Sequence, residues 1–298
     1  MLILGWRDYM TWINAIVQGL LLGGLYALLA AGLSLVFGVM RIVNLAHGVL
    51  AVVAAYMGLV FVQTFDVSPF LAILIVVPIM GLLGFVVQWR LFTPSLRRGG
   101  LAPLLVAFGL AVVLTQVLQE IFTADTRSIQ IGSLASSSFE VTPEIFIGVL
   151  PLVTFVVGVC VIIVLQTFLS VTPLGRAMRA ASDDPETVTL MGIDNRLVYA
   201  LATAIAFGTL GLAGIFLGMR TQFSPTFGDA ILIFAFEAVI IGGLGSLWGT
   251  LLGGLVLGAA QTVGSQINPS YGVLAGHLVF LFVLAVKPSG LIPKTVDR

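Results

Sequence analysis

The chain has 298 residues, of which 59% are apolar and only 9% are charged, and its formal net charge is zero. Soluble domains carry about 25% charged residues, so this composition excludes an ordinary water-soluble fold and indicates an integral membrane protein. A net charge of zero gives no sign of nucleic-acid binding. The 34 glycines are typical of helices that pack closely in lipid.

A membrane-spanning helix needs about 20 apolar residues, and the chain contains a series of stretches of this length. The candidate spans are 12–38, 47–65, 69–92, 104–124, 143–169, 198–219, 229–245, 246–267 and 271–287. Only the breaks at 93–103, 125–142 and 171–196 exceed a few residues, so no separate soluble domain is expected. We predict an all-α polytopic bundle of about 8–9 transmembrane helices that forms a single domain, 1–298.

The first predicted span, 12–38, follows a start that lacks the basic region of a signal peptide, so we expect a retained helix. After it, the segment RIVNLAHG interrupts the helical pattern with Asn44 and His47. Polar groups are costly in lipid and need partners, and broken helices near the middle of a membrane commonly frame substrate paths. We interpret Asn44 and His47 as a gate or part of a substrate path; the alternative is a tight cytoplasmic turn after Arg41.

The longest polar break contains TPLGRAMRAASDDPETVTLMGIDNR, residues 172–196. Thr172 precedes a proline, as helix caps commonly do, and Asp184 before the next proline predicts a second helix that stops at Gly192. We expect two short helices on the membrane surface, apolar on one side, which suits docking into a groove of a partner; the alternative is a solvated loop. The candidate contact residues are Arg176, Arg179, Asp183, Asp184, Glu186 and Gly192.

Glu237 lies about two turns into the predicted span 229–245. We interpret it either as a residue of the substrate path or as a contact to a neighbouring helix or subunit. His277 in the last span is expected to be a packing histidine that bonds to a backbone carbonyl.

Glycines recur with G-x-x-x-G spacing in the C-terminal third of the chain. This spacing places small residues on one helix face, where backbones can meet closely within the fold or against a second subunit. The sequence GGLGS at 242–246 predicts a tight hairpin. The residues assigned to packing are Gly245, Gly249, Gly253, Gly254 and Gly258.

Lysine and arginine concentrate in three regions, 90–98, 176–196 and 287–298. Cytoplasmic loops carry an excess of these residues, so we place all three regions in the cytoplasm. Two arrangements remain open for the N-terminal half. Either the chain crosses about nine times with an external N-terminus, or residues 39–65 dip into the membrane and return, which leaves about eight crossings.

Patterns for catalysis and for metal binding are missing. The two histidines are isolated, and no H-E-x-x-H motif or Cys/His cluster is present. Cys160 stands alone between valines and is expected to be a small buried hydrophobic residue. We therefore predict a protein that is not an enzyme and that binds neither a metal nor a cofactor.

Four segments spread across nearly the whole chain carry a specific combination of motifs. They are GGLYALLAAGLSLVFGVMRIVNLAHGVLAVVAAY (23–56), GRAMRAASDD (175–184), AFEAVIIGGLGSLWGTLLGG (235–254) and VLAVKPSGLIP (283–293). Together they resemble the LIV-type permeases of branched-chain amino acid ABC transporters, and in particular the LivH-like subunit. The spacing of Glu186 and Gly192 is also similar to the EAA loop of ABC importer permeases, although the two alanines of that signature are Thr187 and Val188 here.

The resemblance implies a multi-pass protein of the bacterial or archaeal cytoplasmic (inner) membrane. It implies four partners: a second, LivM-like permease subunit, two LivG/LivF-like ATPases that dock on 172–196, and a periplasmic substrate-binding protein. A separate ATPase agrees with the residues, because neither Lys287 nor Lys294 lies in a G-x-x-x-x-G-K-[ST] motif. Urea and short-amide importers have similar permeases and are an alternative, as is an ion-coupled secondary transporter, for which Glu237 is the available ionisable residue.

Overall fold

The computed structural model describes residues 2–142 and 145–293, which fold almost entirely into helices with one short antiparallel hairpin. The long helices are α1 (Leu2–Met40), α2 (His47–Phe65), α3 (Pro69–Val87), α5 (Ala102–Phe122), α6 (Val149–Val171), α9 (Asn195–Arg220), α10 (Gly228–Gly242), α11 (Leu247–Ile267) and α12 (Tyr271–Val286). The short elements are η1 (Gln88–Phe92), α4 (Thr93–Leu96), η2 (Gly132–Ala135), β1 (Ser138–Thr142), β2 (Ile145–Gly148), α7 (Pro173–Asp183), α8 (Pro185–Leu190) and η3 (Pro225–Phe227).

Eight helical stretches of the described chain are long and apolar enough to cross a membrane. This confirms the predicted all-α polytopic membrane protein, and most helix bounds lie within a few residues of the predicted spans. The third stretch, Pro69–Leu96, continues from α3 through the π-helical turn η1 into α4. The predicted start of the fifth span at 143 lies outside the described residues, and α6 begins only at Val149, after β2.

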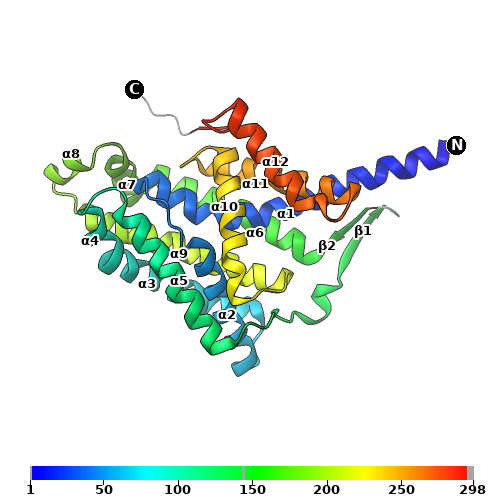
Figure 1. Cartoon of the computed structure of the whole chain (residues 1–298), viewed down its shortest axis with the longest axis horizontal. Coiled ribbons are helices and arrows are strands. Elements are labelled where there is room, and N and C mark those ends of the chain that lie inside the picture. The colour runs from blue at the N-terminus through cyan, green and yellow to red at the C-terminus, as the bar shows by residue number, and fades with distance from the viewer. Residues whose placement is uncertain (1, 143–144, 294–298) are drawn as a thin grey trace.

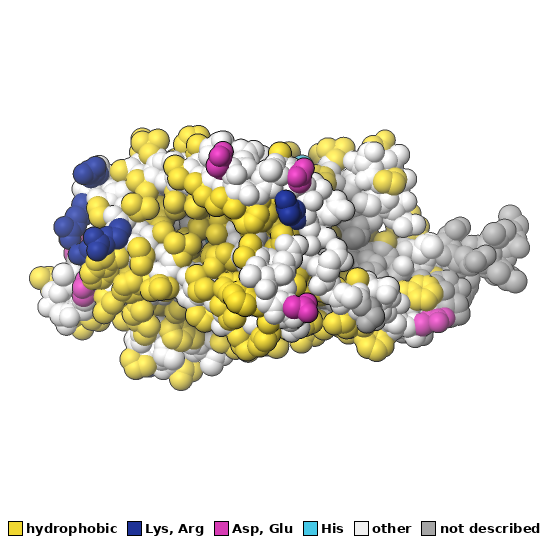
Figure 2. All heavy atoms as spheres, turned by 90° about the horizontal axis from the view of Figure 1, so that it is seen from below, with side chains coloured by type: hydrophobic (Ala, Val, Ile, Leu, Met, Phe, Trp, Pro, Cys, Tyr) yellow, Lys and Arg dark blue, Asp and Glu magenta, His cyan; other side chains and the backbone are white. Residues whose placement is uncertain are grey.

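The two ends of the molecule differ in charge. We call one the basic end, which holds α4, α7 and α8, and the other the hairpin end, which holds β1 and β2 (Figure 1). Lysine and arginine side chains gather at the basic end, at the left of Figure 2. α1 joins the two ends: Gln18 donates a hydrogen bond to the Phe146 carbonyl at the hairpin end, and the Gly38 carbonyl accepts one from Ser182 at the basic end.

From α1 onward, successive long helices of the described chain alternate in direction, although α2 and α10 begin inside the bundle. α12 has 16 residues, is shorter than the eight spans, and makes a ninth pass. Because the first half of α1 lies at the hairpin end, the structure favours the nine-pass arrangement. The dip expected at 39–65 is nevertheless partly present: residues 41–46 are not helical, and α2 starts at His47, beside Leu29 in the middle of α1.

Two parts of the chain have the same order of elements: a long helix, a non-helical break and a second helix. α1 is followed by the break 41–46 and then α2, and α9 is followed by the break 221–227 and then α10. The two long helices are antiparallel: Arg220 at the end of α9 donates to the Leu21 carbonyl of α1, whereas Gly32, later in α1, lies against Ala206, earlier in α9. The helices after the breaks meet at their first turns, where a Cβ atom on Gly48 would lie 2.0 Å from the carbonyl oxygen of Gly228.

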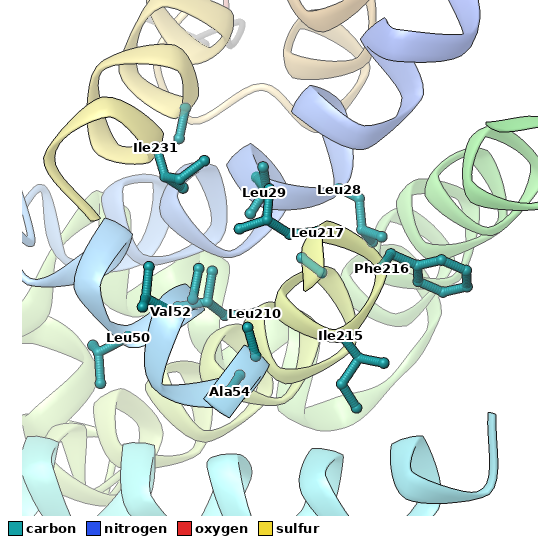
Figure 3. Close-up of a cluster of buried hydrophobic side chains, with 14 of the residues drawn as sticks. Leu28, Leu29, Leu50, Val52, Ala54, Leu210, Ile215, Phe216, Leu217 and Ile231 are labelled. Atoms are coloured by element: carbon teal, nitrogen blue, oxygen red, sulfur yellow. The ribbon is translucent and has the colours of Figure 1, made fainter. Parts of the chain in front are cut away.

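The largest apolar core lies among α1, α2, α9 and α10. Figure 3 shows buried side chains that come from all four helices. Central and outer helices differ in how much of them is buried. In α1, 83% of the most apolar 18-residue stretch is buried inside the protein, whereas in α5 the value is 11%. Outer helices therefore present apolar side chains outward, as expected of a surface that faces lipid. The residues labelled in Figure 3 are Leu28, Leu29, Leu50, Val52, Ala54, Leu210, Ile215, Phe216, Leu217 and Ile231.

Candidate functional site

α7 is firmly packed against the bundle at the basic end. As predicted, Thr172 caps it: the hydroxyl oxygen accepts a hydrogen bond from the N–H of Gly175 at 3.0 Å. A Cβ on Gly175 would lie 2.3 Å from a carbonyl oxygen of α6, so the two backbones are in direct contact. On the same buried face, Ser182 donates to the Gly38 carbonyl of α1 at 2.6 Å. α7 is therefore in direct contact with both α1 and α6.

α8 projects beyond α7 at the far end of the molecule (Figure 1). Its buried anchor is Val188, whereas Leu190 and Met191 are 88% and 75% exposed. Gly192 follows with a φ of +83°, a left-handed conformation that glycine adopts without strain, and it ends the helix as predicted. Two large apolar side chains exposed beside a polar surface are typical of a docking site for another protein.

Asp184 caps α8 with its carboxylate. The carboxylate accepts hydrogen bonds from the N–H groups of Glu186 and Thr187, each at 3.1 Å. The Thr187 hydroxyl, together with these N–H groups, holds the pKa of Asp184 below its ordinary value. Asp183 and Glu186 are exposed nearby, so the start of α8 carries a stable negative charge at the position that favours one.

The two arginines of α7 lie on its exposed side. Arg176 donates to the Val171 carbonyl at 2.8 Å, and Arg179 donates to the Ser170 carbonyl at 3.4 Å. Both carbonyls belong to the last turn of α6, where cations are favourable. Within the described chain neither arginine forms an ion pair with an acidic side chain, so both keep charge available to a partner.

One further contact joins the polar loop to the bundle, and the sequence analysis did not find it. The guanidinium of Arg196 lies 3.7 Å from the ring centroid of Trp89, a cation–π contact. It connects the start of α9 with η1. A tryptophan just before a basic loop is a weak signal, because Trp is also common at membrane interfaces.

Asn44 and His47 lie inside the bundle and not in a surface turn. Their exposed fractions are 3% and 1%. The side chain of Asn44 accepts from the N–H of Ala46 at 3.0 Å, and His47 donates from Nε2 to the Leu29 carbonyl at 2.8 Å. This burial does not fit the alternative of a tight cytoplasmic turn after Arg41, since the break re-enters the bundle and its polar groups find partners there. The role of the two residues in a substrate path stays a prediction.

A second buried polar contact lies next to this break. Thr203 of α9 donates to the side-chain carbonyl of Gln88 at 2.9 Å, and both residues line a very small space together with Asn44. The sequence analysis missed Gln88 and Thr203. The available signal was an amide side chain within an apolar run, which needs a partner in lipid.

Glu237 contacts a neighbouring helix. It is 4% exposed, and its Oε1 is in hydrogen-bond contact with Nδ1 of His277 on α12. The expectation that His277 bonds to a backbone carbonyl is therefore wrong: the carboxylate of α10 takes that place. Oε2 of Glu237 has no hydrogen-bond partner. No hydrogen bond in the described chain joins Glu237 to Asn44 or His47, so the three residues do not form one cluster.

Tyr26 and Gln261 form the polar contact between α1 and α11. The Tyr26 hydroxyl donates to Oε1 of Gln261, and the Tyr26 ring lies 5.3 Å from that of Phe234 on α10. The Phe234 ring in turn is stacked near His277. A polar and aromatic group thus links α1, α10, α11 and α12. Periodicity alone does not reveal it, because each member lies on a different helix.

A comparison with known protein families identifies the family to which this helical arrangement belongs. Residues 15–286 match the family described as branched-chain amino acid transport system / permease component. The chain belongs to this permease family.

Relatives of known name cover almost the whole permease. The permease protein BraD of the high-affinity branched-chain amino acid transport system of Pseudomonas aeruginosa is 29% identical over 94% of this chain and 95% of its own length. The corresponding LivH of Escherichia coli K12 is 26% identical over 96% and 97%. LivM of the same organism is 29% identical over 41% of this chain and 29% of its own length. No solved structure matches the chain.

Glycines bring the helices of this permease into backbone contact. A Cβ on Gly253 would lie 2.0 Å from the Ala238 carbonyl of α10, and one on Gly258 would lie 2.3 Å from the Gly19 carbonyl of α1. Gly249 faces α10 and Gly254 faces α1 in the same way. α11 is thus wedged between two helices, with one pair of glycines for each.

Two expectations about small residues need correction. Gly245 is not on the face of α11: it lies in the predicted hairpin, has a φ of +78° and faces Gly38. Cys160 is exposed on the outside of α6 and not buried. The helical period places it there, on a surface whose other exposed members, such as Val156 and Val164, are equally apolar.

Proposed function

We propose that this permease is one subunit of an ABC importer that carries branched-chain or other apolar amino acids across the cytoplasmic (inner) membrane of a bacterium or archaeon. Family membership and the names of BraD and LivH support this substrate class. The chain acts as one transmembrane unit, and its basic end faces the cytoplasm, in line with the excess of Lys and Arg there.

The observation that carries the proposal is the form of residues 172–196. A firmly packed helix, α7, supports a projecting helix, α8, whose tip exposes Leu190 and Met191. An apolar tip among charges suits insertion into a groove of a soluble protein. We assign the groove to the ATPase subunits, with Arg176, Arg179, Asp183, Asp184, Glu186 and Gly192 framing the contact. ATP hydrolysis is assigned to those subunits alone.

The remaining partners follow from the same assignment. The local likeness to LivM supports a second, homologous permease subunit of the LivM type. Two LivG/LivF-like ATPases would engage the basic ends of the pair, and a periplasmic binding protein would deliver the substrate to the hairpin ends.

The substrate path is assigned to the breaks at the centre of the bundle. Asn44 and His47 lie at the start of α2, and the break before α10 lies against it through Gly48 and Gly228. Unwound backbone at mid-membrane depth offers polar groups to a zwitterion. Glu237 stands on α10 beyond this point, where the unpartnered Oε2 supplies a negative charge or an acceptor for an ammonium group.

Uptake by reconstituted vesicles tests the proposal. The permease with its partner subunits is placed in liposomes that contain ATP, and uptake of leucine, urea and acetamide is measured. We expect ATP-dependent uptake of leucine. Leu190→Glu should lower it at least about tenfold, because a charge then enters an apolar contact. The control is Leu101→Glu, at a leucine between α4 and α5 that is 74% exposed, and this variant should transport normally.

Three results would contradict the proposal. Normal ATP-dependent uptake of leucine by Leu190→Glu would contradict the role assigned to α8. Uptake of urea or acetamide without leucine would change the substrate class. Uptake driven by an ion gradient in the absence of ATPases would place the chain among secondary transporters.

A further inference from the structure

A cavity of about 400 Å³ lies behind α7 at the basic end. Its walls come from α1, α6, α7, the hairpin before α11 and the C-terminal segment at 292–293. The volume falls in the range of about 300–1,000 Å³ that is typical of small-molecule sites. The cavity is separate from the tip of α8 and from the breaks at the centre of the bundle.

The polar groups of the cavity are placed to receive a ligand. Ser34 of α1 lines it, is 1% exposed, and has a hydroxyl oxygen without a hydrogen-bond partner. Buried hydroxyl groups normally have one. Arg179 is the one charged residue among the described lining residues. Its hydrogen bond to the Ser170 carbonyl is long, at 3.4 Å, and uses one of five N–H donors.

The remainder of the lining is mixed: Leu35, Val39, Leu169, Met178 and Trp248 supply apolar surface, and Gln166, Ser170 and Ser246 add polar side chains. Among the lining residues that the structure describes, no carboxylate accompanies this guanidinium, which therefore favours an anion, and its planar fork suits a carboxylate. The apolar side chains of the wall leave room for an apolar body, and the polar ones can hydrogen-bond further groups of the ligand. We propose that this cavity binds a small carboxylate with an apolar body, such as a branched-chain amino acid, from the cytoplasmic side.

Because of the position of the cavity, a bound ligand would affect the movement of α7 during transport. This step rests on the proposed function, in which α7 and α8 receive the motion of the ATPases. Arg179 and Met178 belong to α7, whereas Ser34 belongs to α1 and Trp248 to α11. A bound carboxylate bridges these helices and opposes any movement of α7. Accumulated amino acid therefore slows its own import.

Photo-crosslinking of the full chain tests binding without any ATPase. The chain is placed in nanodiscs of phosphatidylcholine and irradiated with a diazirine analogue of leucine, and modified peptides are mapped by mass spectrometry. We expect labelling of the lining residues of α7 or of 245–248. Leucine and 4-methylpentanoate should compete, whereas leucinamide, which lacks the carboxylate, should not. Arg179→Gln should lower labelling about tenfold.

The matched control is Arg176→Gln, one turn away on α7 and outside the cavity. Labelling should be unchanged in it. Equal labelling in the two variants, or labelling absent from the cavity, overturns the inference.

An anionic lipid headgroup shares this chemistry, so the experiment is repeated with phosphatidylglycerol. The assignment to a free carboxylate is overturned if phosphatidylglycerol abolishes the labelling and if this lipid co-purifies with the parent chain but not with Arg179→Gln. Because no ATPase is present, failure here leaves the uptake test of the importer standing.

Discussion

The contact of α11 with α1 and α10 differs sharply from the tip of α8. At the former, glycines bring backbones so close that even a methyl group would overlap a neighbouring carbonyl. At the latter, a short helix is held by its caps and by Val188, and its last side chains are exposed. The first region allows no change of shape, whereas the second presents a surface. The difference agrees with the proposed coupling, in which a rigid body is moved through a separate projecting element.

The largest expected effect comes from filling the backbone contact. In Gly258→Ala, the new methyl group would lie 2.3 Å from the Gly19 carbonyl oxygen and 2.5 Å from the Gly23 nitrogen, neither of which can rotate away. We expect the free energy of unfolding to fall by about 3 kcal/mol, seen as a lower melting temperature of the purified chain. Gly109→Ala is the control, since nothing lies within 4 Å of its added methyl group. An equal effect of both changes would contradict the rigid contact.

The contact between α10 and α12 should have the next largest effect. His277→Leu leaves the buried carboxylate of Glu237 without its partner, and we expect a loss of about 2 kcal/mol in thermal or denaturant unfolding. The double variant with Glu237→Leu should recover most of it, because no buried polar group is then left unpaired. Additive losses in the double variant would show that the two side chains do not act as a pair.

Changes at α8 should spare folding and affect coupling. Glu186→Arg combined with Gly192→Pro reverses a charge at the first turn and forbids the φ of +83° at the helix end. We expect the ratio of leucine transported to ATP hydrolysed to fall about tenfold, with an unchanged melting temperature. A normal ratio would mean that the ATPases make contact elsewhere on the basic end.

The smallest expected effect is local. In Asp184→Ala, the N–H groups of Glu186 and Thr187 lose their acceptor, and their hydrogen exchange should accelerate about tenfold. Asp183→Ala, which removes the neighbouring exposed carboxylate, should leave that exchange unchanged. Because folding lowers the pKa of Asp184, the stabilisation is present above the ordinary value of about 3.8 and is lost as the pH falls through the lower folded value. Protection that persists far below that value would contradict the cap.

Much of the fold was predictable because it depends on local chemistry. The apolar runs predicted the spans, since only a helix satisfies its backbone in lipid. Thr172, Asp184 and Gly192 predicted the ends of α7 and α8, because caps act within a few residues. The hairpin at 242–246 follows from the same kind of signal, a glycine-rich turn between apolar runs.

Contacts between distant segments were not predictable in this way. His277 and Glu237 are joined by helix packing across 40 residues, and one sequence carries no record of that pairing. The exposure of Leu190 and Met191 depends on where α7 rests, which is decided by its contacts with α1 and α6. The path of residues 41–46 depends on the partners that Asn44 and His47 find inside the bundle.

The break at 41–46 has a consequence for chain length. From Leu29 to Met40 the helix rises about 16 Å, and six extended residues can return that height with about 20 Å of reach. Removing two residues would leave a reach of about 13 Å, which is shorter than that height and would part His47 from the Leu29 carbonyl, now 2.8 Å away. The number of residues in this segment therefore limits how deep in the bundle α2 can begin, and the partners of Asn44 and His47 fix its position within that limit.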